Sequence, residues 1–193
     1  MKRLFAALKI EATPVFIRTF QDLSTGLRHE SIKWVEPQNI HITLKFFGET
    51  DEKKIPFIYQ ALQKAAGQSE GFVLKINRTG IFGSRYDPRV IWFGIDPEPQ
   101  LSRLAENTAR ELENAGWQAD RQNFVPHLTI GRIREIRDKA LFQQVIDRFR
   151  EVKIQEQPIR EICLYESILR REGPLYIKLA SFGLNKPHEL IQE

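Results

Sequence analysis

Cysteine is almost absent from the sequence. The 193 residues include one, Cys163, so no disulfide can form within the chain and a zinc site built mainly from cysteines is excluded. Such scarcity is typical of a reducing compartment, and we expect a cytoplasmic protein. No apolar run approaches the roughly 18 residues that a membrane-spanning helix needs. The short apolar stretch near the N-terminus is followed by no small-residue cleavage site, so a secretory signal is not expected.

A large excess of charge of one sign is also missing. Lys and Arg number 29 and Asp and Glu 25, which gives a net charge of +4. The basic residues form no long tail, so a nonspecific binder of long duplexes is disfavoured. Hydrophobic residues make up 41% of the chain, enough for a core, which excludes disordered, collagen-like and coiled-coil proteins. The length fits one compact domain, or two small lobes that share a core.

Helical and strand patterns alternate along the chain. A helix is predicted to begin with Thr13 as its N-cap and Pro14 in its first turn, and a second to begin at Thr50. Two more are predicted over residues 98–115 and 138–149 from the spacing of apolar residues. Strands are predicted over residues 3–10, 71–82, 89–95, 160–169 and 175–184. Helices interspersed with hairpins predict an α+β fold with mainly antiparallel sheets.

Two segments repeat one histidine pattern. His41 and His127 are each followed, two residues later, by a threonine (Thr43 and Thr129), with aliphatic residues in between and after. Side chains alternate between the faces of a strand, so each motif would place its His and Thr together, opposite a core-facing aliphatic row. In an ideal strand Lys45 would share the face of His41.

The side chains of this repeated pattern indicate acid–base chemistry. Imidazole titrates near neutral pH, so one histidine can accept a proton while a second, charged one donates a proton. A threonine hydroxyl can hydrogen-bond to a phosphoryl oxygen. Two His-Thr pairs facing a cleft would suit in-line displacement at phosphorus. From the residues alone, the two histidines could also be structural residues that share a pattern by coincidence. A metal site is disfavoured because neither motif has a nearby carboxylate or cysteine. We therefore expect no metal and no cofactor.

Four further side chains could contribute to such a site. Lys45 is interpreted either as a solvated rim residue or as a phosphate contact. Phe47, Tyr86 and Phe124 could each stack on a nucleobase, although a packing role is favoured for any one of them.

The extended motifs resemble those of a known family. Residues 34–49 and 124–132 are similar to the two motif blocks of the bacterial and archaeal RNA 2′,3′-cyclic phosphodiesterases, also called the LigT or 2′-5′ RNA ligase family, within the two-histidine phosphoesterase superfamily. The resemblance covers nearly the whole chain. It implies a single two-lobed domain over residues 1–193, in which each pseudo-symmetric lobe is an antiparallel sheet with outer helices. The active-site cleft would lie between the lobes.

The resemblance also implies an activity, the hydrolysis of RNA 2′,3′-cyclic phosphate ends to 2′-phosphomonoesters. His41 corresponds to the family's proton donor and His127 to its proton acceptor. Thr43 and Thr129 correspond to the hydroxyls that contact the phosphate. Arg132 corresponds to a further phosphate contact.

The proposed role of Arg132 conflicts with simple strand geometry. In an ideal strand Arg132 would lie on the face of Leu128, away from His127. The role therefore requires the strand to bend near Gly131.

Two other functions stay open at this point. The same site could join RNA ends through a 2′-5′ linkage, with a 5′-hydroxyl replacing water. A noncatalytic RNA- or nucleotide-binding module is the second alternative, although binding alone does not need two titrating groups. In each case the expected ligand is an RNA end or a small cyclic nucleotide, with no membrane partner, and the expected state is a monomer.

Overall fold

The computed structural model of the protein describes residues 1–84, 86–118, 124–171 and 173–186. Within these residues the chain forms strands, α-helices and two short 3-10 turns, η1 and η2. In chain order the elements are β1 (Lys2–Lys9), α1 (Pro14–Gly26), β2 (Ser31–Trp34), η1 (Pro37–Asn39), β3 (His41–Thr50), η2 (Glu52–Lys54), α2 (Ile55–Gly67), β4 (Phe72–Gly83), β5 (Pro88–Ile95), α3 (Pro99–Asn114), β6 (His127–Glu135), α4 (Lys139–Arg148), β7 (Lys153–Ile159), β8 (Glu161–Leu169) and β9 (Pro174–Gly183).

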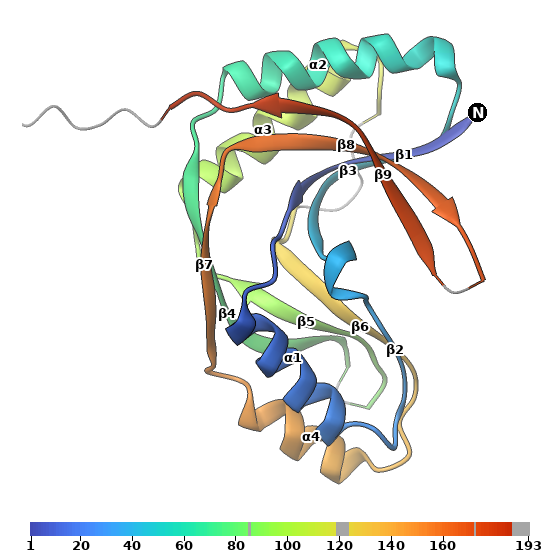
Figure 1. The fold of residues 1–193 in the computed structure, drawn as a ribbon, viewed down its shortest axis with the longest axis vertical. Helices are drawn as coiled ribbons and strands as arrows, with labels where there is room; N and C mark the ends of the chain where they lie inside the picture. The colour runs from blue at the N-terminus through green and yellow to red at the C-terminus, as the bar shows by residue number, and fades with distance from the viewer. Residues whose placement is uncertain (85, 119–123, 172, 187–193) are drawn as a thin grey trace, which may run out of the picture.

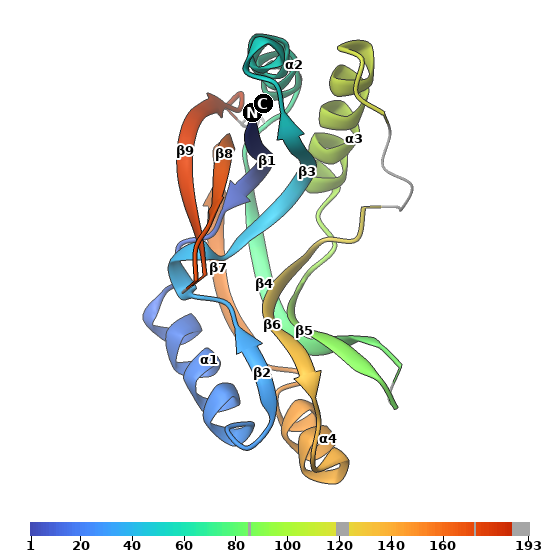
Figure 2. The ribbon, with the colours of Figure 1, turned by 90° about the vertical axis from the view of Figure 1, so that its right-hand side faces the viewer.

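The strands form two antiparallel sheets. The first sheet has the order β3-β1-β8-β9 and the second the order β2-β6-β5-β4-β7. Helices α2 and α3 lie over the first sheet, and α1 and α4 lie at the other end of the molecule against the second (Figure 1). Figure 2 shows the two sheets after a quarter turn about the vertical axis, with α2 and α3 again at one end and α1 and α4 at the other. The predicted α+β fold with two lobes and outer helices is confirmed.

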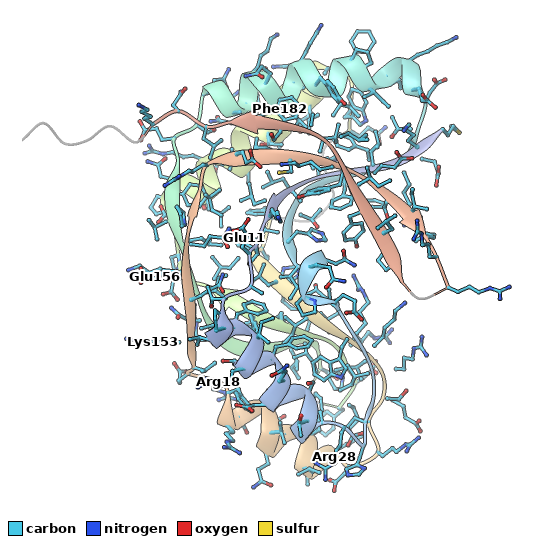
Figure 3. All side chains as sticks on the ribbon, in the orientation of Figure 1. Glu11, Arg18, Arg28, Lys153, Glu156 and Phe182 are labelled. Carbon is cyan, nitrogen blue, oxygen red and sulfur yellow. The ribbon has the colours of Figure 1, made fainter. Side chains whose placement is uncertain are left out.

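One apolar core runs through both lobes. On α1, Thr13 caps the helix through its hydroxyl and Pro14 follows, as the sequence predicts. The helix buries Phe16 against Phe93 of β5, with ring centroids 5.1 Å apart. At the other end, Phe182 of β9 lies beneath α2 (Figure 3). The helices therefore cover one face of each sheet, and the other face of each sheet is left to form a cleft.

One prediction about an individual element needs correction, and two strands lack a prediction. The helix predicted from Thr50 begins at Ile55 instead, because β3 continues to Thr50 and Asp51 caps the turn η2. Strands β2 and β7 were not predicted. Strand β2 has only four residues, and β7 is an edge strand in which apolar residues are sparse, so neither has a strong apolar period. No helix in the described part of the chain is long and apolar enough to span a membrane.

The packing of α1 predicts a large difference between two adjacent residues. Phe16→Ala empties a fully buried position and should lower the free energy of unfolding by about 3–5 kcal/mol. Val15→Ala, at a side chain that is 54% exposed, should change it by less than about 0.5 kcal/mol. Urea unfolding followed by circular dichroism measures both. Equal losses would show that α1 does not pack as described.

Candidate active site

A cavity of about 1070 Å³ lies between the two sheets, extends along α3, and is called the cleft below. Its lining includes all five residues that the sequence assigned to the site: His41, Thr43, His127, Thr129 and Arg132. The first two come from β3 in the first sheet and the other three from β6 in the second. The fold thus brings the two motifs, far apart in the sequence, to one cavity.

Both histidines are oriented by the same local contact. Nδ1 of His41 lies 2.7 Å from the carbonyl oxygen of Asn39, and Nδ1 of His127 lies 2.7 Å from that of Val125. A carbonyl oxygen can only accept a hydrogen bond, so Nδ1 carries the proton in each ring. The Nε2 atom is left to accept a proton when the ring is neutral or to donate one when the ring is charged.

The strand bends as the role of Arg132 requires. In the pairing of β5 with β6, Thr129 lies opposite Trp92 and Gly131 opposite Ile91, so Ile130 is an extra residue in a β-bulge. The bulge shifts the alternation by one position. Arg132 therefore returns to the face of Thr129 and lines the cleft.

The first motif carries a matching bulge. Thr43 pairs with Ala7 and Lys45 with Ala6, so Leu44 is the extra residue on β3. The prediction that Lys45 shares the face of His41 is wrong, because the bulge turns Lys45 to the opposite face. There it is buried and donates a hydrogen bond from Nζ to the carbonyl oxygen of Gln118, at 2.7 Å.

Phe46 takes the place on the cleft face that an ideal strand would give to Lys45. Its ring is 48% exposed and lines the cleft, whereas an ideal strand would have turned it to the core. The guanidinium carbon of Arg3 lies 4.9 Å from its ring centroid. Phe46 follows His41 by five residues, as Arg132 follows His127. This shared spacing was the signal in the sequence that could have identified Phe46.

Aromatic side chains surround His41. The ring centroids of Phe5 and Tyr176 lie 4.9 and 5.4 Å from its own, and Tyr165 stacks on Phe5. Burial among these rings lowers the pKa of His41, and the hydrogen bond to the carbonyl of Asn39 opposes that shift only in part. The side chain of Asn39 also holds the β8–β9 hairpin beside the motif through the carbonyl of Pro174, at 3.0 Å.

Positive charges from both sheets act on Tyr176. Burial raises the pKa of Tyr176, while the positive charges of Arg132 and Arg3 lower it. Both guanidinium groups therefore lie near this phenol, one from each sheet. Neither Arg3 nor Tyr176 was assigned to the site from the residues alone. In the described residues, no three His, Cys, Asp or Glu side chains gather as a metal site would require.

The three aromatic residues that the sequence offered for base stacking have different surroundings. Phe47 packs against Trp117, with ring centroids 5.8 Å apart, as part of the core. Tyr86 is exposed in the β4–β5 turn and does not line the cleft. Phe124 lines the cleft and also packs against the core.

Comparisons with known proteins show the family and the fold. The family model described as LigT like Phosphoesterase matches residues 10–92 and 94–176, and each stretch holds one motif. A protein of Methanocaldococcus jannaschii named RNA 2′,3′-cyclic phosphodiesterase is 34% identical over 90% of this chain and 96% of its own length. One of the same name from Methanothermobacter thermautotrophicus is 31% identical over 79% of this chain and 83% of its own.

Solved structures share the fold. The crystal structure of TT0787 of Thermus thermophilus has a TM-score of 0.74 and 28% identity, over 96% of this chain and 100% of that one. Escherichia coli LigT complexed with 3′-AMP has a TM-score of 0.70 and 22% identity, over 95% and 98% of the two chains. With the family model covering both motifs and most of the chain, the protein belongs to the LigT-like phosphoesterase family.

Proposed function

We propose that the protein hydrolyses RNA 2′,3′-cyclic phosphate ends to 2′-phosphomonoesters. The observation that carries this proposal is the pair of histidines in one cleft, each with Nδ1 bound to a backbone carbonyl and Nε2 left for proton transfer. The relatives named RNA 2′,3′-cyclic phosphodiesterase support the choice of substrate. A cytoplasmic location and a monomeric state stay predictions of the sequence.

The reaction needs one proton acceptor and one proton donor. Nε2 of His127 takes a proton from a water molecule as the water oxygen bonds to phosphorus. The bond from phosphorus to the ribose 3′ oxygen breaks on the opposite side. Nε2 of His41 gives its proton to that oxygen, which leaves a 2′-phosphate and a 3′-hydroxyl. Each turnover ends with His127 charged and His41 neutral, so a proton must return before the next one.

The other cleft residues stabilise the transferring phosphate and the nucleoside. The hydroxyls of Thr43 and Thr129 lie beside their own histidines and can donate to phosphoryl oxygens. Arg132 can bind the phosphate through two parallel hydrogen bonds. The exposed ring of Phe46 offers a surface on which a base can stack. Arg3, which lies over the same ring, adds positive charge.

The burial of His41 affects the acid role that we propose for it. In the free protein, burial favours the neutral ring. A bound phosphate anion would favour the charged ring, because an opposite charge nearby stabilises it. The substrate would therefore help to protonate the acid that acts on it.

The proposed function predicts the product and the metal requirement of an assay. An oligoribonucleotide with a 2′,3′-cyclic phosphate end should be converted to the 2′-phosphate product, and a strong chelator should not change the rate. The measurement is chromatography of the products against 2′- and 3′-phosphate standards. A 3′-phosphate product, or activity that a chelator abolishes and zinc or manganese restores, would contradict the two-histidine mechanism.

The environment of His41 predicts its titration. Its NMR resonance, identified by its loss in His41→Asn, should titrate below the ordinary imidazole pKa of about 6.5 in the free protein and move upward when inorganic phosphate is bound. Because the unfolded chain then binds the proton at a higher pH than the folded one, stability should fall as the pH drops below about 6.5. His41→Asn should weaken this fall. A pKa above 6.5 in the free protein would contradict the burial argument.

A modified leaving group should separate the roles of the two histidines. His41→Ala and His127→Ala should each lower the rate on the normal substrate by about 10²- to 10⁴-fold. With sulfur in place of the bridging 3′ oxygen, the departing thiolate needs no proton, so His41→Ala should recover most of its rate while His127→Ala stays slow. Recovery of His127→Ala instead would show that the roles are reversed.

A further inference from the structure

A second pocket, of about 340 Å³, adjoins the cleft at His127. It shares His127 and Val125 with the cleft, but its described lining contains no residue of the first sheet. In an in-line displacement the attacking oxygen enters on the side of the base. The second pocket therefore adjoins the entry side of an attacking 5′-hydroxyl strand. A preceding nucleotide is joined to the reacting ribose through its 5′ oxygen and would have to reach the pocket from the ribose side.

Aromatic rings form much of the wall of this pocket. Phe82 packs edge-on against His127, with ring centroids 4.7 Å apart, and lies 5.5 Å from the indole of Trp92. The indole lies directly over Gly80 on β4. A Cβ atom at position 80 would come within 2.2 Å of the indole, so only glycine permits this placement. A flat indole surface of this kind can stack a nucleobase of any sequence.

Two arginines supply positive charge at the same place. Arg78 and Arg150 line the pocket, the first from β4 and the second from the turn after α4. Arg78 contacts Asp96 at 3.3 Å and Arg150 contacts Asp147 at 2.7 Å, and all four side chains are partly exposed. Each guanidinium has five N–H groups, so both retain donors for a phosphate.

We propose that the second pocket binds one further nucleotide of RNA, with its base against Trp92 and its phosphate at Arg78 and Arg150. The inference rests on the proposed function of the cleft. Two sources share this chemistry: the nucleotide that precedes the cyclic phosphate in the same strand, and the 5′-hydroxyl end of a separate strand that attacks in place of water. In the second case the 5′ oxygen bonds to phosphorus, the 3′ oxygen leaves with a proton, and a 2′-5′ linkage forms.

The test compares a mononucleoside 2′,3′-cyclic phosphate with a dinucleotide that ends in the same group. The wild-type protein should have a kcat/KM about 5- to 100-fold higher for the dinucleotide, the range that one stacked base provides. Arg150→Gln and Gly80→Ala, which displaces the indole without removing it, should each reduce this ratio toward one. Arg148→Gln, at the last residue of α4 and outside the pocket lining, should leave the ratio unchanged.

A second arm tests the separate strand. Adenosine 3′-monophosphate, which has a free 5′-hydroxyl, is added in millimolar excess to the mononucleoside substrate, and a 2′-5′-linked dinucleotide is sought by mass spectrometry. A product that both pocket variants lose would identify the separate strand as the occupant. A dinucleotide preference without such a product would identify the preceding nucleotide.

Two results would overturn the inference. In the first, the wild-type protein shows neither the dinucleotide preference nor the ligated product. In the second, the pocket variants retain both. Failure of the proposed function is distinct, because the mononucleoside substrate would then not be hydrolysed at all. In that case the indole N–H resonance of Trp92 still reports on binding of the dinucleotide. A shift in the wild-type protein that Arg150→Gln weakens supports the pocket, and no shift rejects it.

Discussion

One extra residue directly after each His-x-Thr motif determines which side chains reach the cleft. A strand alternates its faces with a period of two, so one inserted residue exchanges the faces of the residues that follow, up to any further bulge. Ile130 causes this exchange on β6 and Leu44 causes it on β3. The consequence is that Arg132 and Phe46 join the strand face of their histidines, whereas Lys45 turns to the opposite face of β3 and lines the cavity from there. A cation from one lobe and an aromatic ring from the other then face the same cavity, although the two motifs are nearly identical up to that point.

The sequence predicted the features that depend on regular periods and short motifs. Helix α1 was predicted because Thr13, Pro14 and an apolar stripe agree, and the two histidines were found because the same tetrapeptide pattern occurs twice. The features that it did not predict depend on contacts between distant residues. Lys45 is buried because β1 pairs with β3 around a bulge, and no property of the local sequence marks Leu44 as the extra residue. Strand β2 forms mainly because β6 offers it an edge.

The two histidines have the same anchor but different surroundings. Each is held by the carbonyl two residues before it, which is a purely local device. The first sheet then surrounds His41 with Phe5 and Tyr176, whereas among the described residues the second sheet places only Phe82 against His127 in an aromatic contact. The two histidines thus differ in their surroundings because of packing from the two sheets, and not because of the motifs themselves. In the proposed mechanism the positions of the two rings about the phosphate assign the tasks of accepting and donating a proton, and the unequal packing adds to that difference.

Each sheet contains strands from both halves of the chain, so the two lobes depend on each other for folding. Strand β2 lies at the edge of the second sheet with β6 as its neighbour, and β8, which follows β7 directly in the chain, is the neighbour of β1 in the first. A fragment ending at residue 92 would therefore keep β3 with β1 but leave β2 without β6, and it would expose the edges where β6 and β8 belong. We therefore expect that neither half of the chain folds as a separate unit, and that a proteolytic cut that released one half would disrupt both sheets.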